Sequence, residues 1–195
     1  MDTMETIIAG ENYTDKHFDG LDLKAADLQE STFIRCSFVE CDLRDSKCNS
    51  ARFEDCNFSN AKISGTNFFD TSFIGAKLIG IDFSVKTKIL ATQFENCVLN
   101  FSNFQKVDLT NILFKNCSCI EVNFSGAVLS KTVFLDSRVH NCIFVGSHFD
   151  LTDFHTCELL GFNLFEDKLK GIILSPSQFL SFASDIGVSL VGNVE

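Results

Sequence analysis

The feature of this sequence that most constrains its fold is an apolar residue at every fifth position. All fourteen residues of the first series are apolar: Phe18, Leu23, Leu28, Phe33, Phe38, Leu43, Cys48, Phe53, Phe58, Ile63, Phe68, Phe73, Leu78 and Phe83. A second series runs from Phe94 to Leu169, and the residue two places before each apolar centre is usually small. Apolar residues recur every 3.6 positions in an amphipathic helix and every second position in a strand, so neither element explains this period.

The five-residue units resemble the pentapeptide-repeat family, whose motif is an alanine, then aspartate or asparagine, then leucine. The segments that carry the motif most clearly are Ala26-Asp27-Leu28, Cys41-Asp42-Leu43, Cys56-Asn57-Phe58 and Thr152-Asp153-Phe154. The resemblance covers about residues 16–170. It implies an all-β solenoid, a right-handed quadrilateral β-helix in which four pentapeptides form one coil.

The length of one coil can be tested within the sequence itself. The gap between Phe83 and Phe94 is one residue longer than two repeats, so we place a centre at Ile89 and an inserted residue before it, within an irregular stretch at 84–91. A 20-residue coil then stacks seven phenylalanines in one column: Phe33, Phe53, Phe73, Phe94, Phe114, Phe134 and Phe154. With coils about 4.8 Å apart, the sequence predicts a rod whose lumen is filled by stacked rings.

After Leu169 the five-residue rhythm stops and a helical pattern begins. Ser175 suits a helix cap, Pro176 the first helical position, and Gln178 lies three residues after the cap. Residues 188–191 read as a short strand. We therefore expect three segments: an N-terminal cap at 1–15, the repeat body at 16–170, and a capping and dimerisation segment at 171–195.

The C-terminal segment resembles that of Qnr-type quinolone-resistance proteins and related topoisomerase-protecting pentapeptide proteins. The resemblance is carried by Leu169-Lys170-Gly171, Leu174, Gln178 and the run from Ile186 to Gly192. It implies a homodimer formed through the terminal helix; the alternative is a cap that closes a single monomer. The expected interface residues are Phe179, Leu180, Phe182, Ala183, Ile186, Val188 and Leu190.

The composition excludes several classes of function. A net charge of −10 argues against direct binding to nucleic acid, because phosphates are met by Lys and Arg. No apolar run is long enough to cross a membrane. The chain has an odd number of cysteines, nine, and its N-terminus lacks the pattern of an export signal, so we expect a cytoplasmic protein with reduced thiols.

No constellation of residues suggests catalysis or a cofactor. Four of the cysteines, Cys36, Cys56, Cys97 and Cys117, fall at inward positions along one line, where zinc would need four converging ligands, so we interpret the cysteines as small core residues. His17, His140, His148 and His155 lie at outward positions without a nucleophile beside them. We expect no enzyme, no metal, no cofactor and no small-molecule substrate.

Two candidate partner-binding features remain on the outside of the rod. The first is a side that carries Glu54, Asp55, Glu95, Asp136 and Asp153, and the second is the irregularity with Lys86, Thr87 and Lys88. The Qnr resemblance implies that the rod binds a type II topoisomerase such as gyrase in place of DNA, countering a quinolone or a natural poison. No side is strongly acidic, so a pentapeptide-repeat scaffold with a different partner stays open as the alternative.

Overall fold

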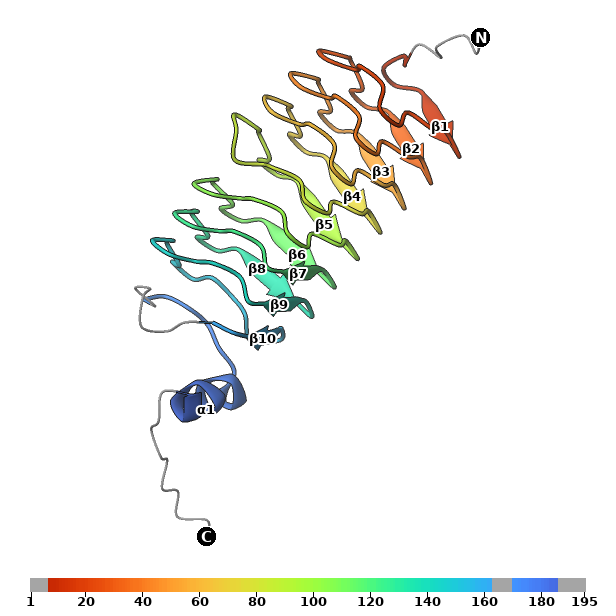
Figure 1. The fold of residues 1–195 in the computed structure, drawn as a ribbon. Coiled ribbons are helices and arrows are strands. Elements are labelled where there is room, and N and C mark those ends of the chain that lie inside the picture. The colour runs from red at the N-terminus through yellow and green to blue at the C-terminus, as the bar shows by residue number, and fades with distance from the viewer. Residues whose placement is uncertain (1–6, 163–169, 186–195) are drawn as a thin grey trace.

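The computed structural model describes residues 7–162 and 170–185, which form a rod of stacked coils closed by one helix (Figure 1). Ten strands of three residues each and one helix make up the described elements. In chain order they are β1 (Asn12–Thr14), β2 (Thr32–Ile34), β3 (Arg52–Glu54), β4 (Ser72–Ile74), β5 (Gln93–Glu95), β6 (Leu113–Lys115), β7 (Ser118–Ile120), β8 (Val133–Leu135), β9 (Arg138–His140), β10 (Glu158–Leu160) and α1 (Pro176–Asp185).

Every strand pairing is parallel and joins one coil to the next. One sheet has the order β1-β2-β3-β4-β5-β6-β8 and a smaller one the order β10-β9-β7. Phe33 pairs with Phe53, 20 residues on, whereas Phe73 pairs with Phe94, 21 residues on. The expected fold class is thus confirmed as a parallel β-solenoid of about seven turns with one short C-terminal helix, and the one-residue insertion lies where the sequence placed it.

The rod has four sides, and we define each side by the apolar centres that point inward from it. The sheet side has Tyr13 and the seven phenylalanines of the predicted column, and carries β1 to β6 and β8. The second side has centres 18, 38, 58, 78, 99, 119, 139 and 159, the third side 23, 43, 63, 83, 104, 124 and 144, and the fourth side 28, 48, 68, 89, 109, 129 and 149. Isolated parallel bridges join the coils along the third and fourth sides, as between Asp22 and Asp42 or between Asp27 and Lys47.

The core is a set of phenylalanine stacks that run along the rod. On the sheet side, ring centroids of neighbouring coils lie 5.1 Å apart for Phe33 and Phe53, 5.5 Å for Phe73 and Phe94, and 4.8 Å for Phe134 and Phe154, with nearly parallel planes. Rings on adjacent sides meet edge to face. Both arrangements are the preferred geometries of aromatic pairs. The column of seven phenylalanines predicted from the sequence is thus confirmed, and its rings fill the lumen.

The small inward residues are polar in many coils because a backbone carbonyl of the preceding coil lies within hydrogen-bond distance of most of them. The hydroxyl of Thr132 donates to the Leu109 carbonyl at 2.8 Å, and that of Thr152 to the Leu129 carbonyl at 2.7 Å. Thiols do the same more weakly, as Cys56 does to the Phe33 carbonyl at 3.4 Å. A buried hydroxyl is tolerated only with a partner, and the repeat supplies one at this position.

Helix α1 begins as the sequence predicted and closes the C-terminal end of the rod. The Ser175 hydroxyl accepts from the Gln178 amide at 3.2 Å, while the Gln178 side chain accepts from the Ser175 amide at 2.7 Å. The Gln178 side-chain amide also donates to the Phe154 and Cys157 carbonyls at 2.7 and 2.8 Å, which fixes the rotation of the helix. Phe182 and Ala183 are consequently buried, and the Phe182 ring lies 5.9 Å from that of Phe162.

The N-terminal end of the coiled body differs from the expected boundary. Tyr13 of β1 stacks on Phe33 at 5.0 Å and β1 pairs in register with β2, so the coiled body begins before residue 16. The expected strand at 188–191 lies outside the described residues.

Candidate protein-binding surfaces

The structure brings all five acidic candidates onto the sheet side. Glu54 ends β3, Glu95 ends β5, Asp55 follows β3 and Asp136 follows β8. Asp153 is bridged to Val133, which begins β8. The sequence-based grouping of these carboxylates on one side is therefore geometrically sound.

Three of the five carboxylates are paired with a positive or protonatable neighbour. The Glu54 carboxylate accepts from Arg52, the Glu95 carboxylate from the Lys115 ammonium at 2.8 Å, and Asp153 lies 2.6 Å from a ring nitrogen of His155. Among the described residues, Asp55 and Asp136 alone of the five make no ion pair. Exposed pairs of this kind are weak, but they lower the net negative field that the side presents.

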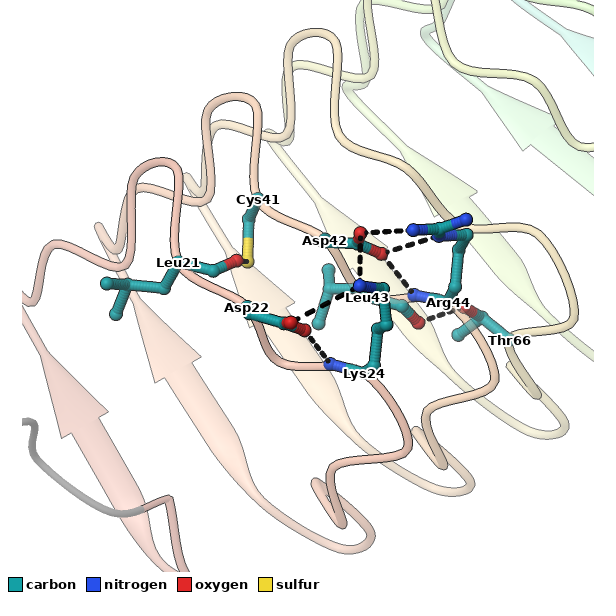
Figure 2. A network of polar contacts seen from close by, with 8 residues as sticks. All are labelled: Leu21, Asp22, Lys24, Cys41, Asp42, Leu43, Arg44 and Thr66. Carbon is teal, nitrogen blue, oxygen red and sulfur yellow. Dashed lines mark hydrogen bonds and ion pairs between the residues drawn. The ribbon is translucent and has the colours of Figure 1, made fainter.

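A chain of alternating charges runs along the third side near the N-terminal end (Figure 2). The Lys24 ammonium lies 3.2 Å from Asp22 and 3.3 Å from Asp42, and Arg44 donates to Asp42 through two nitrogens, at 2.8 and 2.7 Å. The hydrogen bond from Arg44 is the largest cause that holds the pKa of Asp42 well below its usual value. This part of the third side is therefore neutralised from within the chain.

The irregularity at 84–91 is a bulge on the corner between the third and fourth sides, where the loop between β4 and β5 stands out from the rod (Figure 1). Lys86 and Lys88 are exposed, as the sequence led us to expect. Thr87 occupies the small inward position, and its hydroxyl donates to the Ile63 carbonyl at 3.1 Å. Of the three candidates, the two lysines are exposed, and the threonine is half-buried with its hydroxyl bonded to the preceding coil.

A hollow of about 660 Å³ lies beside the bulge and was not among the sequence-based predictions. Its lining includes Phe69 and Leu90 together with Lys86, Lys88 and Lys106. Phe69 was recognisable as an outward apolar residue, but Lys106 lies one coil further on and becomes a neighbour only through the coil geometry. The combination of an insertion with three nearby lysines was the one signal that could have found the hollow.

Of the seven residues expected at a dimer interface, the four that the structure describes divide into two groups. Phe179 and Leu180 are 59% and 52% exposed on the outer surface of α1. Phe182 and Ala183 instead face the last coil, because Gln178 turns that side of the helix toward the rod. Ile186, Val188 and Leu190 lie outside the described residues.

The interior offers no described site for a metal. Among the residues that the structure describes, no group of three His, Cys, Asp or Glu is placed to bind an ion. All nine cysteines are buried and unpaired, and burial raises the pKa of the Cys41 thiol to about 12. In the same part of the chain, no helix is long and apolar enough to cross a bilayer.

The repeat pattern is recognised independently by a family model for pentapeptide repeats, which matches residues 22–60, 51–84 and 117–156. These segments cover more than half of the chain. The chain belongs to the pentapeptide-repeat family.

Comparison with solved structures supports the same fold over nearly the whole chain. Two trypsin-treated variants of QnrB1, described as a plasmid-mediated fluoroquinolone resistance protein, superpose with TM-scores of 0.70 and 0.71 at 21% and 22% identity. The matches cover 94% of this chain and 93% and 91% of the two QnrB1 chains. A search of curated proteins found no match. At this identity the likeness to QnrB1 is one of fold.

Proposed function

We propose that this pentapeptide-repeat protein is a non-enzymatic, cytoplasmic protein that binds a type II topoisomerase such as gyrase and protects it from quinolones or a natural poison. The observation that carries the proposal is the continuous ring stack that fills the lumen, with Phe33, Phe53 and Phe134 fully buried. A filled interior leaves only the outer sides for function, as expected of a binding protein. The likeness in fold to trypsin-treated QnrB1, over 94% of this chain, supports the choice of partner.

The mode of binding that we propose is occupancy of the DNA site by a rod with acidic sides. Duplex DNA carries about one negative charge per 1.7 Å of axis, which is about twice as dense as a net charge of −10 spread over about seven turns at about 4.8 Å spacing. The rod therefore imitates the shape of a duplex more than its charge. On the sheet side, Asp55 and Asp136 are the carboxylates best placed to meet cations of the partner, because the other three candidates are already paired.

A homodimer would double the length of such a rod. Phe179 and Leu180 point away from the coil end and give the outer surface of α1 two large apolar side chains. Two copies related by a two-fold axis would bury both against their equivalents. Replacing both residues with aspartate should convert a dimer into a monomer in sedimentation velocity, whereas an unchanged dimer would place the interface elsewhere.

The charge pairing of the sheet and third sides favours a second candidate, a repeat scaffold with a different protein partner. Ion pairs such as Glu95 with Lys115 and Asp42 with Arg44 reduce the acidity on which DNA imitation depends. On this alternative the rod would bind through shape and apolar contacts. The two candidates differ in what they predict for gyrase.

Supercoiling by purified gyrase, measured with and without ciprofloxacin while this protein is titrated, separates them. We expect rescue from the drug at micromolar protein, followed by inhibition of supercoiling at higher concentrations. An Asp55→Asn and Asp136→Asn variant should lose most of the effect, while a Glu40→Gln and Glu121→Gln control, with the same charge change on the exposed corner of the second side, should keep it. If the protein causes neither rescue nor inhibition at micromolar levels, the result would favour the scaffold.

A further inference from the structure

The hydrogen-bond ladder of the fourth side is interrupted at the bulge. Bridges join Asp27 to Lys47, Lys47 to Asn67 and Asn67 to Lys88, and another joins Asp108 to Val128, but none joins Lys88 to Asp108. Above the break the Phe68 amide donates to the Lys88 carbonyl at 2.7 Å, and below it the Leu109 amide donates to the Val128 carbonyl at 2.8 Å. The ladder of the third side also lacks one step, between Lys62 and Asp82, while the second side and the sheet side stay continuous. The inserted residue has therefore opened the ladders on the two sides that meet at its corner.

Four backbone amides are left without a protein acceptor at this break, those of Lys86, Ile89, Ala91 and Asp108. The amides of Lys86, Ile89 and Ala91 correspond to those of Lys106, Leu109 and Asn111 in the next coil, all of which donate to the coil that follows. Within the described residues, the first three donate to no carbonyl. An unpaired N–H is costly unless water or a ligand accepts from it, so the gap presents an array of hydrogen-bond donors.

Three lysines lie around the same gap without ion pairs. Lys86 and Lys106 are the corner residues of successive coils, with φ of 58° and 59°, and Lys88 directly precedes the fourth-side centre Ile89. None of the three forms a salt bridge with a described residue. The acid in the lining, Asp108, accepts from the amide of Thr110 at 2.9 Å within its own turn. In a chain with a net charge of −10, this is a local concentration of positive charge.

Two exposed apolar side chains complete the hollow. Phe69 and Leu90 hold the same repeat position in successive coils, directly after the paired centres Phe68 and Ile89, and are 44% and 63% exposed. An occupant that covers them must carry an apolar group, while the lysines and free amides require carboxylates. The volume of about 660 Å³ suits a few side chains, since it lies well within the range of ligand sites.

We propose that the bulge hollow binds an acidic peptide segment of a protein partner, with one apolar side chain against Phe69 and Leu90 and its carboxylates on Lys86, Lys88 and Lys106. A peptide with a few charges fits better than nucleic acid, because a rod of net charge −10 repels a long polyanion. The site is distinct from the acidic sheet side and does not depend on the identity of any partner bound there.

An NMR titration of the full-length protein tests the proposal with a capped pentapeptide, a phenylalanine between two pairs of glutamates. We expect shifts concentrated at the Lys86, Ile89 and Ala91 amides, weakening as salt is added. A peptide with serine in place of the phenylalanine should bind more weakly, and one with lysines in place of the glutamates should not bind. Shifts spread evenly over the rod, or larger shifts with an oligothymidylate than with the acidic peptide, would overturn the assignment.

Two variants isolate the lysines and the gap. Replacing Lys86, Lys88 and Lys106 with glutamate should weaken binding about tenfold or more, because three charge contacts become repulsions. The matched control replaces Lys62, Lys77 and Lys131, which are exposed outside the hollow, and should bind as the parent does. Deleting Val85 restores a 20-residue coil and should abolish binding while the circular dichroism spectrum is kept. Equal binding by all three variants would refute the site, and since no topoisomerase is present, the result is independent of the proposed function.

Discussion

The sheet side and the fourth side of the rod respond differently to the same inserted residue. On the sheet side, β4 and β5 pair across the insertion in unbroken register, and the Phe73 and Phe94 rings remain stacked at 5.5 Å. On the fourth side, the next step of the ladder is lost between Lys88 and Asp108. The aromatic stack keeps its register across the insertion, and the disruption falls on the two sides beside the bulge, since the third side also loses its step between Lys62 and Asp82.

The contrast is sharpest if the core is truncated on each side of the same coil. Phe94→Ala should lower the free energy of unfolding by about 3–5 kcal/mol, because it empties the middle of a continuous stack. Ile89→Ala, beside the broken ladder, should cost about 2 kcal/mol, at the low end for core truncations. Urea unfolding measures both, with exposed Phe101→Ala as a control near zero. Equal losses at Phe94 and Ile89 would remove the distinction between the sides.

Deleting Val85 should erase the difference between the two sides. With 20 residues in every coil, the amides of Lys86, Ile89 and Ala91 regain their acceptors, and stability should rise by about 2 kcal/mol. Thermal and urea unfolding of the deletion variant measure the gain. Any substantial loss would mean that the insertion is needed for the register of the sheet side.

Acid should weaken the third side through Asp42. Because its pKa lies below the usual value of about 3.8, the paired carboxylate stabilises the fold above that pH, and the contribution is lost as the pH falls further. Asp42→Asn should therefore cost about 1 kcal/mol at pH 7 and little near pH 2. Unfolding curves over this range check the sign. A cost that does not change with pH would contradict a role for the charge.

The smallest effect concerns the corner between the third and fourth sides away from the bulge. Ala25 and Gly126 hold equivalent positions there with φ of 54° and 67°. Ala25→Gly should stabilise the rod and Gly126→Ala should destabilise it, each by about 0.5–1 kcal/mol, because only glycine adopts this conformation without strain. Paired urea midpoints measure the difference. Shifts of the same sign in both variants would show that side-chain contacts dominate at this corner.

The fold was predictable from the sequence because its determinants are local and periodic. The 20-residue column of phenylalanines, the insertion before Ile89 and the Ser175–Gln178 cap each follow from spacing and residue type. The face of α1 was not predictable in the same way. Gln178 turns Phe182 inward through hydrogen bonds to two carbonyls of the last coil, and such long-range acceptors leave no trace in helical spacing.

The candidate surfaces were predictable only in part, since the position of a charged residue on a side does not determine which ion-pair partner it has. The five acids do share the sheet side, but pairing of Glu54 with Arg52 and of Glu95 with Lys115 depends on rotamers and coil register. Likewise, the sequence located the insertion without indicating which ladder would break. The hollow exists because the extra residue breaks the ladders on both sides of its corner, a property of the assembled coils.

Residue-resolved amide hydrogen exchange tests the central claim most directly. Ile89 and Leu109 hold equivalent inward positions on the fourth side, and both side chains are buried. The account predicts slow exchange at Leu109, whose amide donates to Val128 at 2.8 Å, and exchange at Ile89 faster by orders of magnitude. Equal protection of the two amides would mean that the ladder is intact at the bulge, and the contrast between the two sides would fail.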